Sequence, residues 1–119
     1  MKAKLSKFFL LLKLELEEIQ QDLQSLLEIY RSYEQKHQIT NYVLQENSSL
    51  IQAEIAALGS LKKLLDTCVH PEDFESLDDL VKEILAQFKE FITKKNYPLA
   101  LYYLIERKVQ KVVRYINIE

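Results

Sequence analysis

The sequence predicts an all-α fold, an antiparallel four-helix bundle that begins with a long heptad helix. Apolar residues recur at helical spacing along the chain, and its 119 residues include one Gly and two Pro, too few for the turns of a β-rich fold. Hydrophobic residues make up 48% and charged residues 29%, as in ordinary folded domains. We therefore expect one helical domain over 1–119, with a long hairpin at 4–69, a turn at 70–76 and a shorter helical hairpin at 77–116.

The first predicted helix, from about Lys4 to Lys36, carries a seam of residues whose spacing alternates between four and three. This heptad repeat predicts left-handed packing of a narrow apolar stripe against another helix. A helix of this length spans about 50 Å, so we expect an elongated molecule. The seam consists of Leu5, Phe9, Leu12, Leu16, Ile19, Leu23, Leu26, Tyr30, Tyr33 and His37.

The second helix is predicted from about Ile39 to Val69. No Gly or Pro separates it from the first helix, so one continuous helix is the alternative. We favour a turn because the heptad spacing of the seam is lost near His37. The apolar face of the second helix is wider than a heptad seam, which predicts two neighbours and a central place in the bundle. Small residues at 53–59 should allow close approach of another backbone.

A clear boundary follows at 70–76, where Pro71 ends the second helix and Ser76 has the sequence context of an N-cap. The third helix is predicted from Leu77 to Lys94. The turn Asn96-Tyr97-Pro98 should join it to a fourth helix that runs from Pro98 to about Ile116.

The last two helices carry opposite charge. Residues 66–90 hold eight acids and two lysines, whereas residues 94–114 hold six bases and one acid. Since a short turn makes these helices antiparallel neighbours, we expect their opposite charges to face each other.

The single cysteine, Cys68, rules out an intrachain disulfide and favours a reducing compartment, most simply the cytoplasm. The apolar run after Lys2, Lys4 and Lys7 is too short for a signal peptide, and no stretch is long enough for a membrane span. We interpret this segment as the solvated basic start of a helix. The alternative is that these lysines, with Phe8 and Phe9, bind an anionic lipid surface.

Few residues suit catalysis or metal binding. Glu34 and His37 have the spacing of a di-iron ligand pair, but the sequence contains no second copy, and Cys68 and His70 alone cannot complete a zinc site. We expect no metal and no cofactor.

Arg31 is followed by His37 in a spacing that resembles the RNA-cleaving motif of HEPN-domain ribonucleases, which are small all-α proteins. Ser32 and Ile39 stand where that motif has other residue types. The resemblance implies a ribonuclease or a toxin–antitoxin component in which Arg31 and His37 act on RNA, and we keep this as the alternative function.

The leading hypothesis is a non-enzymatic helical protein–protein interaction module, such as an adaptor, an assembly subunit or a small chaperone. Its partner would be itself, as a homodimer, or another helical protein, and we expect no nucleic acid. The first helix is too long for the third and fourth helices to cover, and Phe8, Leu11, Leu27 and Ile29 lie off its seam, so we expect these four to remain exposed in a monomer. We therefore expect apolar residues on the first helix to form the interface. The predicted interface residues are Phe8, Phe9, Leu12, Leu16, Ile19, Leu23, Leu27 and Tyr30.

Overall fold

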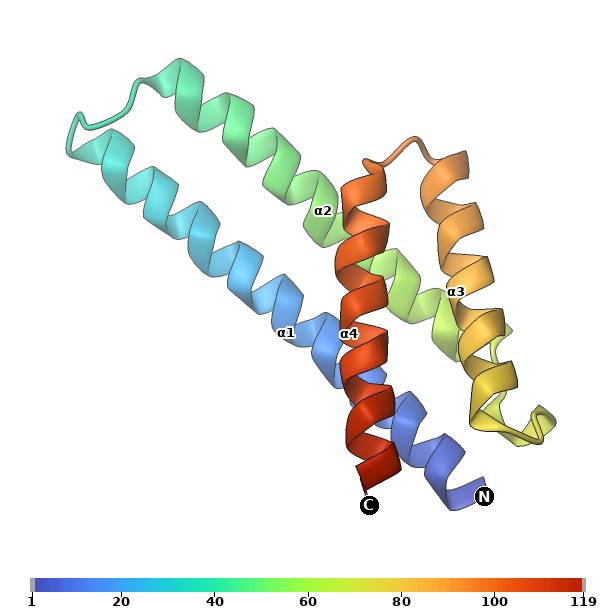
Figure 1. The fold of residues 1–119 in the computed structure, drawn as a ribbon. Coiled ribbons are helices and arrows are strands. Elements are labelled where there is room, and N and C mark those ends of the chain that lie inside the picture. Colours follow the sequence, from blue (N-terminus) through green and yellow to red (C-terminus); the bar gives the residue numbers. More distant parts are fainter. Residues whose placement is uncertain (1, 119) are drawn as a thin grey trace.

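A computed structural model describes residues 2–118 and confirms the all-α four-helix bundle with a long first helix (Figure 1). The elements are α1 Lys2–Gln35, α2 Asn41–Cys68, the short 3₁₀-helix η1 Pro71–Asp73, α3 Leu77–Lys94 and α4 Leu99–Ile118. The predicted bounds of α3 agree with the structure, and those of the other helices differ by one to two residues. Within residues 2–118, no helix has both the length and the hydrophobicity that crossing a membrane requires.

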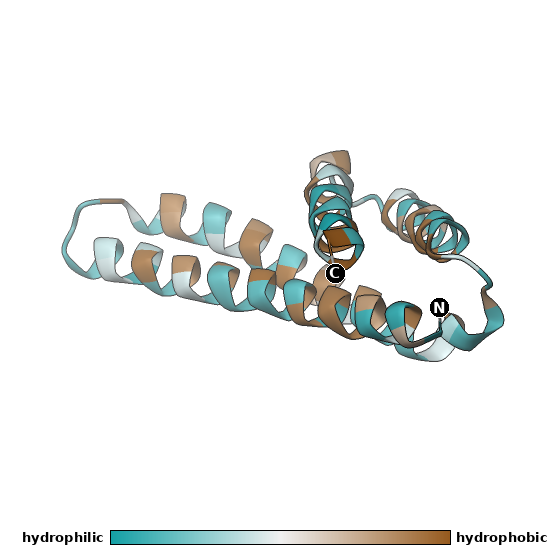
Figure 2. Ribbon diagram, turned by 60° about the horizontal axis from the view of Figure 1, so that its bottom comes forward, coloured by the Kyte–Doolittle hydropathy of each residue, from teal (hydrophilic) through white to brown (hydrophobic). Residues whose placement is uncertain are grey.

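The helices form two hairpins that cross in two layers. The hairpin of α1 and α2 is long. The helices α3 and α4 lie across only one end of it, the end where α1 begins (Figures 1 and 2). The molecule measures 55 × 31 × 20 Å and has a radius of gyration of 16.6 Å. A compact domain of this length is expected to have a radius of gyration of about 13.5 Å, from the dependence of this radius on chain length. The elongation comes from the far half of the first hairpin.

The main core lies where the two layers cross. It takes side chains from the first half of α1, the second half of α2, and both α3 and α4. Helical spacing predicts one inward apolar face on α3 and one on α4, and all of their residues are buried or half-buried there. They are Leu80, Val81, Ile84, Leu85, Phe88, Phe91 and Ile92 of α3 and Leu101, Leu104, Ile105, Val109, Val112, Val113 and Ile116 of α4. The structure adds Tyr102, which is 7% exposed. The fully buried large side chains include Phe8, Leu12, Leu16, Leu58, Leu61, Leu65, Leu80, Ile84, Phe88, Ile92 and Ile105.

The predicted central position of α2 is wrong, because α1 is the helix that packs against every other element. The long α1 passes beneath both α3 and α4, whereas α2 packs mainly against α1. The small residues of α2 do allow close packing as predicted. A Cβ on Gly59 would lie 3.3 Å from the Gln20 side-chain nitrogen, and that nitrogen donates a hydrogen bond of 3.0 Å to the Ile55 carbonyl.

The buried stripe of α1 also departs from the predicted heptad seam. Phe8 is 0% exposed and Leu27 only 2%, whereas their neighbours Phe9 and Leu26, which the seam assigns inward, are half-buried and 39% exposed. A stripe with a strict 3.5-residue period drifts around a straight helix of 3.6 residues per turn. Leu27 follows this drift. Phe8 is buried instead because it belongs to the core that α1 shares with α3 and α4, and Leu5 keeps its place in the seam at 0% exposed.

Caps define the ends of the helices. The Ser76 hydroxyl accepts a hydrogen bond of 3.1 Å from the Asp79 backbone, which confirms the predicted N-cap of α3. The Thr40 hydroxyl is the N-cap of α2 and accepts a hydrogen bond of 3.2 Å from the Val43 backbone amide. Such caps satisfy backbone donors that a helix leaves unpaired.

The turn between α1 and α2, residues 36–40, contains His37, whose φ is 61°. The His37 amide bonds to the Glu34 carbonyl at 2.9 Å and the Gln38 amide to the Tyr33 carbonyl at 2.8 Å. These are the two bonds of a Schellman C-cap, which normally places Gly at the left-handed position. Asn96, with φ 59°, occupies the same position after α3. The predicted break between the first two helices is thus confirmed.

We predict that His37→Gly raises the free energy of unfolding by about 1 kcal/mol, because Gly adopts this backbone conformation without Cβ strain. Denaturant unfolding at fixed protein concentration measures the change. Asn96→Gly is the matched control and should gain less, since Asn tolerates the left-handed region better than His. A destabilised His37→Gly variant would contradict this account of the turn.

Candidate interaction surface

The far half of the first hairpin, residues 20–56, is here called the arm. It consists of the second half of α1, the turn at 36–40 and the first half of α2, and α3 and α4 lie at the other end of the hairpin (Figure 1). Only Leu27 and Ile51 are buried hydrophobic residues in the arm. Hydrophobic residues nevertheless continue along both of its helices (Figure 2). The arm therefore has apolar side chains without a third helix to cover them.

One face of the arm collects these exposed side chains. Leu26, Ile29 and Tyr33 of α1 are 39%, 46% and 43% exposed. They are spaced by three and four residues, so they lie on one side of the helix. Leu50 of α2 is 59% exposed. These four residues are the arm face.

The arm face continues the surface of α1 that α4 covers in the other half of the hairpin. Leu26, Ile29 and Tyr33 each stand eighteen residues, or five full turns, after Phe8, Leu11 and Glu15. Phe8 is fully buried, and Leu11 and Glu15 line a pocket of about 170 Å³ together with Lys111, Val112 and Tyr115 of α4. The same side of α1 is therefore a helix-packing surface near its start and an open surface in the arm.

Leu50 has an equivalent relation to α3. It stands fourteen residues, close to four turns, before Leu64. Leu64 is half-buried and lines a pocket with Phe91 and other residues of α3. On both helices of the arm, the side that faces solvent is therefore the side against which α3 or α4 packs in the other half of the hairpin.

Ion pairs connect α4 to α1 where the two helices cross. Glu15 is only 16% exposed and lies 2.9 Å from the Lys111 amine and 3.7 Å from the Lys108 amine. Its Oε2 atom has no hydrogen-bond partner, so Lys108 compensates its charge by proximity alone. The prediction that the cations of α4 face the acids of α3 is wrong for these two lysines, because the Glu15 carboxylate on α1 takes both.

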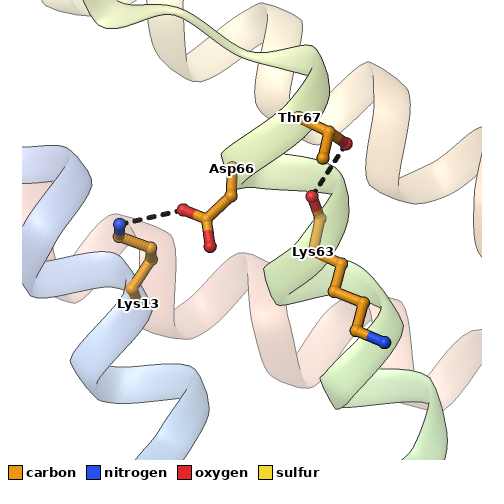
Figure 3. Close-up of polar contacts among 4 residues, drawn as sticks. All are labelled: Lys13, Lys63, Asp66 and Thr67. Atoms are coloured by element: carbon orange, nitrogen blue, oxygen red, sulfur yellow. Dashed lines mark hydrogen bonds and ion pairs between the residues drawn. The ribbon is translucent and has the colours of Figure 1, made fainter.

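A second ion pair lies between α1 and α2. The Lys13 amine is 2.9 Å from Asp66 Oδ1 (Figure 3). Asp66 and Lys13 are 57% and 32% exposed, so water screens this pair and it contributes little to stability. The Thr67 hydroxyl next to Asp66 donates to the Lys63 carbonyl and points along its own helix (Figure 3).

The hydrogen bond from Glu15 raises the pKa of Lys111 above its ordinary value of 10.5, and the charge of Glu15 acts in the same direction. A raised pKa means that Lys111 stabilises the fold fully below pH 10.5 and loses this effect as the pH rises through its folded pKa. We predict that Lys111→Gln is less stable than the wild type at neutral pH and that the difference shrinks in alkali. Denaturant unfolding at several pH values tests this, and a difference that grows with pH would contradict it.

The structure places most of the predicted interface inside the chain. Five of those residues are buried in contacts of the single chain, namely Phe8, Leu12, Leu16, Ile19 and Leu27. Phe9, Leu23 and Tyr30 are half-buried. The expectation that Phe8 and Leu27 remain exposed is therefore wrong, whereas Ile29, also expected to be exposed, is 46% exposed. In the arm, the exposed apolar side chains of α1 are those of the arm face.

Arg31 and His37 are both exposed. His37 belongs to the C-cap of α1 described above, and neither residue lines the four pockets described on this chain. Among residues 2–118, no group of three metal-ligating side chains could hold an ion. None of these pockets brings Arg31 and His37 together.

Comparison of the chain with protein-family models, curated proteins and solved structures finds no match.

Proposed function

We propose that this protein is a non-enzymatic helical interaction module that associates with itself through the arm face, as a two-fold dimer. The observation that carries this proposal is an excess of exposed surface. The chain exposes 7558 Å², whereas a compact monomer of 14.1 kDa is expected to expose about 6,700 Å². The excess, about 800 Å², is similar in size to the area that each partner buries in a standard protein interface.

The helix arrangement supports a second copy as the partner. In the covered half of the hairpin, α1 and α2 pack against two further helices, but in the arm they pack only against each other. A two-stranded helical arm from a second copy would supply the missing pair, and the two arms together would complete a four-helix arrangement. A two-fold axis brings the same face of each copy together, so one self-complementary patch is sufficient.

The composition of the arm face agrees with such a contact. Tyr33 supplies a large amphipathic side chain, and Leu26, Ile29 and Leu50 supply aliphatic area. Aromatic residues are enriched in the cores of protein interfaces, where charged residues are depleted. A different helical protein could use the same face, in which case the chain would be an adaptor, an assembly subunit or a small chaperone.

Disulfide cross-linking tests the proposal. Cys68 is exposed, so the background variant is Cys68→Ser. In that background, Ile29→Cys should give a cross-linked species of twice 14.1 kDa under mild oxidation, because a two-fold axis places copies of the arm face against each other.

The matched control is Leu10→Cys in the same background. Leu10 is 56% exposed but lies in the covered half of the hairpin, outside the arm face. Equal cross-linking of the two variants would show random collision, and its absence from Ile29→Cys would reject the dimer through this face.

A further inference from the structure

A second surface, distinct from the arm face, lies where the start of α1 and the end of α4 come together at one end of the molecule (Figure 1). The Lys7 amine sits 5.5 Å from the centre of the Tyr115 ring and joins the two helices there. Each helix contributes one stripe to this surface. Lys7, Leu10 and Leu14 stand at i, i+3 and i+7 on α1, and Lys111, Tyr115 and Ile118 stand at i, i+4 and i+7 on α4.

The apolar members of both stripes are well exposed. Leu10 and Leu14 are 56% and 51% exposed, and Tyr115 and Ile118 are 53% and 85% exposed. With the cations Lys4, Lys7, Lys111 and Arg114 they form what is here called the basic flank. Large aliphatic side chains exposed between lysines and arginines are typical of helices that lie on a membrane surface.

The charge of the basic flank is opposite in sign to that of the chain. Residues 2–14 hold four lysines and no acid, and residues 107–118 hold four cations and no acid, whereas the whole chain has a net charge of −2. Lys4 and Arg114 make no ion pair with a described residue. Glu15 pairs with Lys108 and Lys111. Glu18, one turn beyond Leu14, lies close enough to Lys111 for its charge to help raise the pKa of that lysine, so the flank ends there.

The acidic helix α3 lies away from this surface. Its Lys89 covers the ring of Tyr102 at 5.7 Å, and Tyr102 and Tyr115 are thirteen residues apart on α4, which separates them by about 140° around the helix. A planar anionic surface can therefore approach the flank without meeting the acids of α3.

We propose that the basic flank binds the surface of an anionic lipid bilayer through the start of α1 and the end of α4. Lys4 and Arg114 would meet the headgroup phosphates, and Leu10, Leu14 and Ile118 would enter the boundary of the acyl chains. Tyr115 suits the headgroup level, where tyrosine is enriched. A nucleic acid would use the cations but would leave the three aliphatic side chains in water, so the bilayer fits the whole surface better.

This surface differs from the lipid-binding group that the sequence suggested. Phe8 is fully buried, and the Lys2 amine donates hydrogen bonds to the backbone carbonyls of Glu72 and Phe74. Lys4 and Lys7 remain part of the surface, and α4 supplies the rest.

The test is co-sedimentation with vesicles of phosphatidylcholine alone and with vesicles that also contain phosphatidylserine. The wild type should bind only the second kind, and added salt should weaken the binding. Each cation lost should lower the partition coefficient about fivefold, so Lys4→Glu with Arg114→Glu should lower it at least about twentyfold. Leu10→Ser with Leu14→Ser should also weaken binding, at unchanged charge.

The matched control is Lys63→Glu with Lys82→Glu, which reverses two exposed lysines outside the flank and should have little effect. Circular dichroism confirms that each variant is folded. An equal loss in the control, or no binding of the wild type to phosphatidylserine at low salt, would overturn the proposal. So would a Leu10→Ser, Leu14→Ser variant that binds vesicles as tightly as the wild type.

This test is independent of the proposed dimer. A variant with Leu26→Asp and Ile29→Asp should lose self-association but keep the salt-sensitive preference for phosphatidylserine, because neither residue belongs to the basic flank.

Discussion

Replacing Phe88 by Ala should lower the free energy of unfolding by about 3–5 kcal/mol. Phe88 is 0% exposed and lies in the core that α3 shares with the other helices. Ala would leave a cavity where the ring was, and the surrounding helices can close it only in part. Denaturant unfolding at fixed protein concentration measures the loss, because dimerisation makes the apparent stability depend on concentration.

Phe91→Ala is the matched control for this prediction. Phe91 is only half-buried, and its ring stacks on Tyr97 at a centroid distance of 6.1 Å. Its removal should cost about half as much, since part of the ring already contacts water. Equal losses for the two variants, or a loss below about 1 kcal/mol for Phe88→Ala, would contradict the assigned inward face of α3.

The second large effect is expected in the arm. Leu26→Asp combined with Ile29→Asp should abolish self-association and leave a folded monomer, because both side chains are exposed in the single chain but would be buried without partners for their charge in the dimer. Sedimentation velocity measures the association, and far-UV circular dichroism measures the helix content.

Two further variants separate association from folding. Leu10→Asp with Leu14→Asp introduces the same charges at exposed positions outside the arm face and should leave the dimer intact. Leu16→Asp should unfold the chain, because Leu16 is 0% exposed and an unpaired charge in the core is very costly. A double arm variant that still forms dimers would show that the contact lies elsewhere.

Local signals in the sequence were sufficient to predict much of the fold. Pro71 and the Ser76 cap locate the start of α3, and a short turn around Asn96 makes α3 and α4 antiparallel. These features depend on a few neighbouring residues and on backbone hydrogen bonds. The inward residues of α3 and α4 follow from helical periodicity for the same reason.

The candidate surface could not be predicted, because it depends on where one helix stops covering another. The helical periodicity of α1 places Leu11 and Ile29 on the same side of the helix. Only the tertiary structure shows that α4 lies beside Leu11 and that Ile29 is exposed. The heptad assumption also shifted the inward stripe by one residue, so Phe8 and Leu27 were expected outside. Glu15, which holds two lysines of α4, gave no signal that distinguished it from the other acids of α1.

The most direct test of the dimer is the molar mass of the unmodified protein, measured by light scattering over a range of concentrations. The proposed contact predicts a mass that approaches twice 14.1 kDa as the concentration rises. A mass that stays at 14.1 kDa up to the highest concentration would contradict self-association through the arm face.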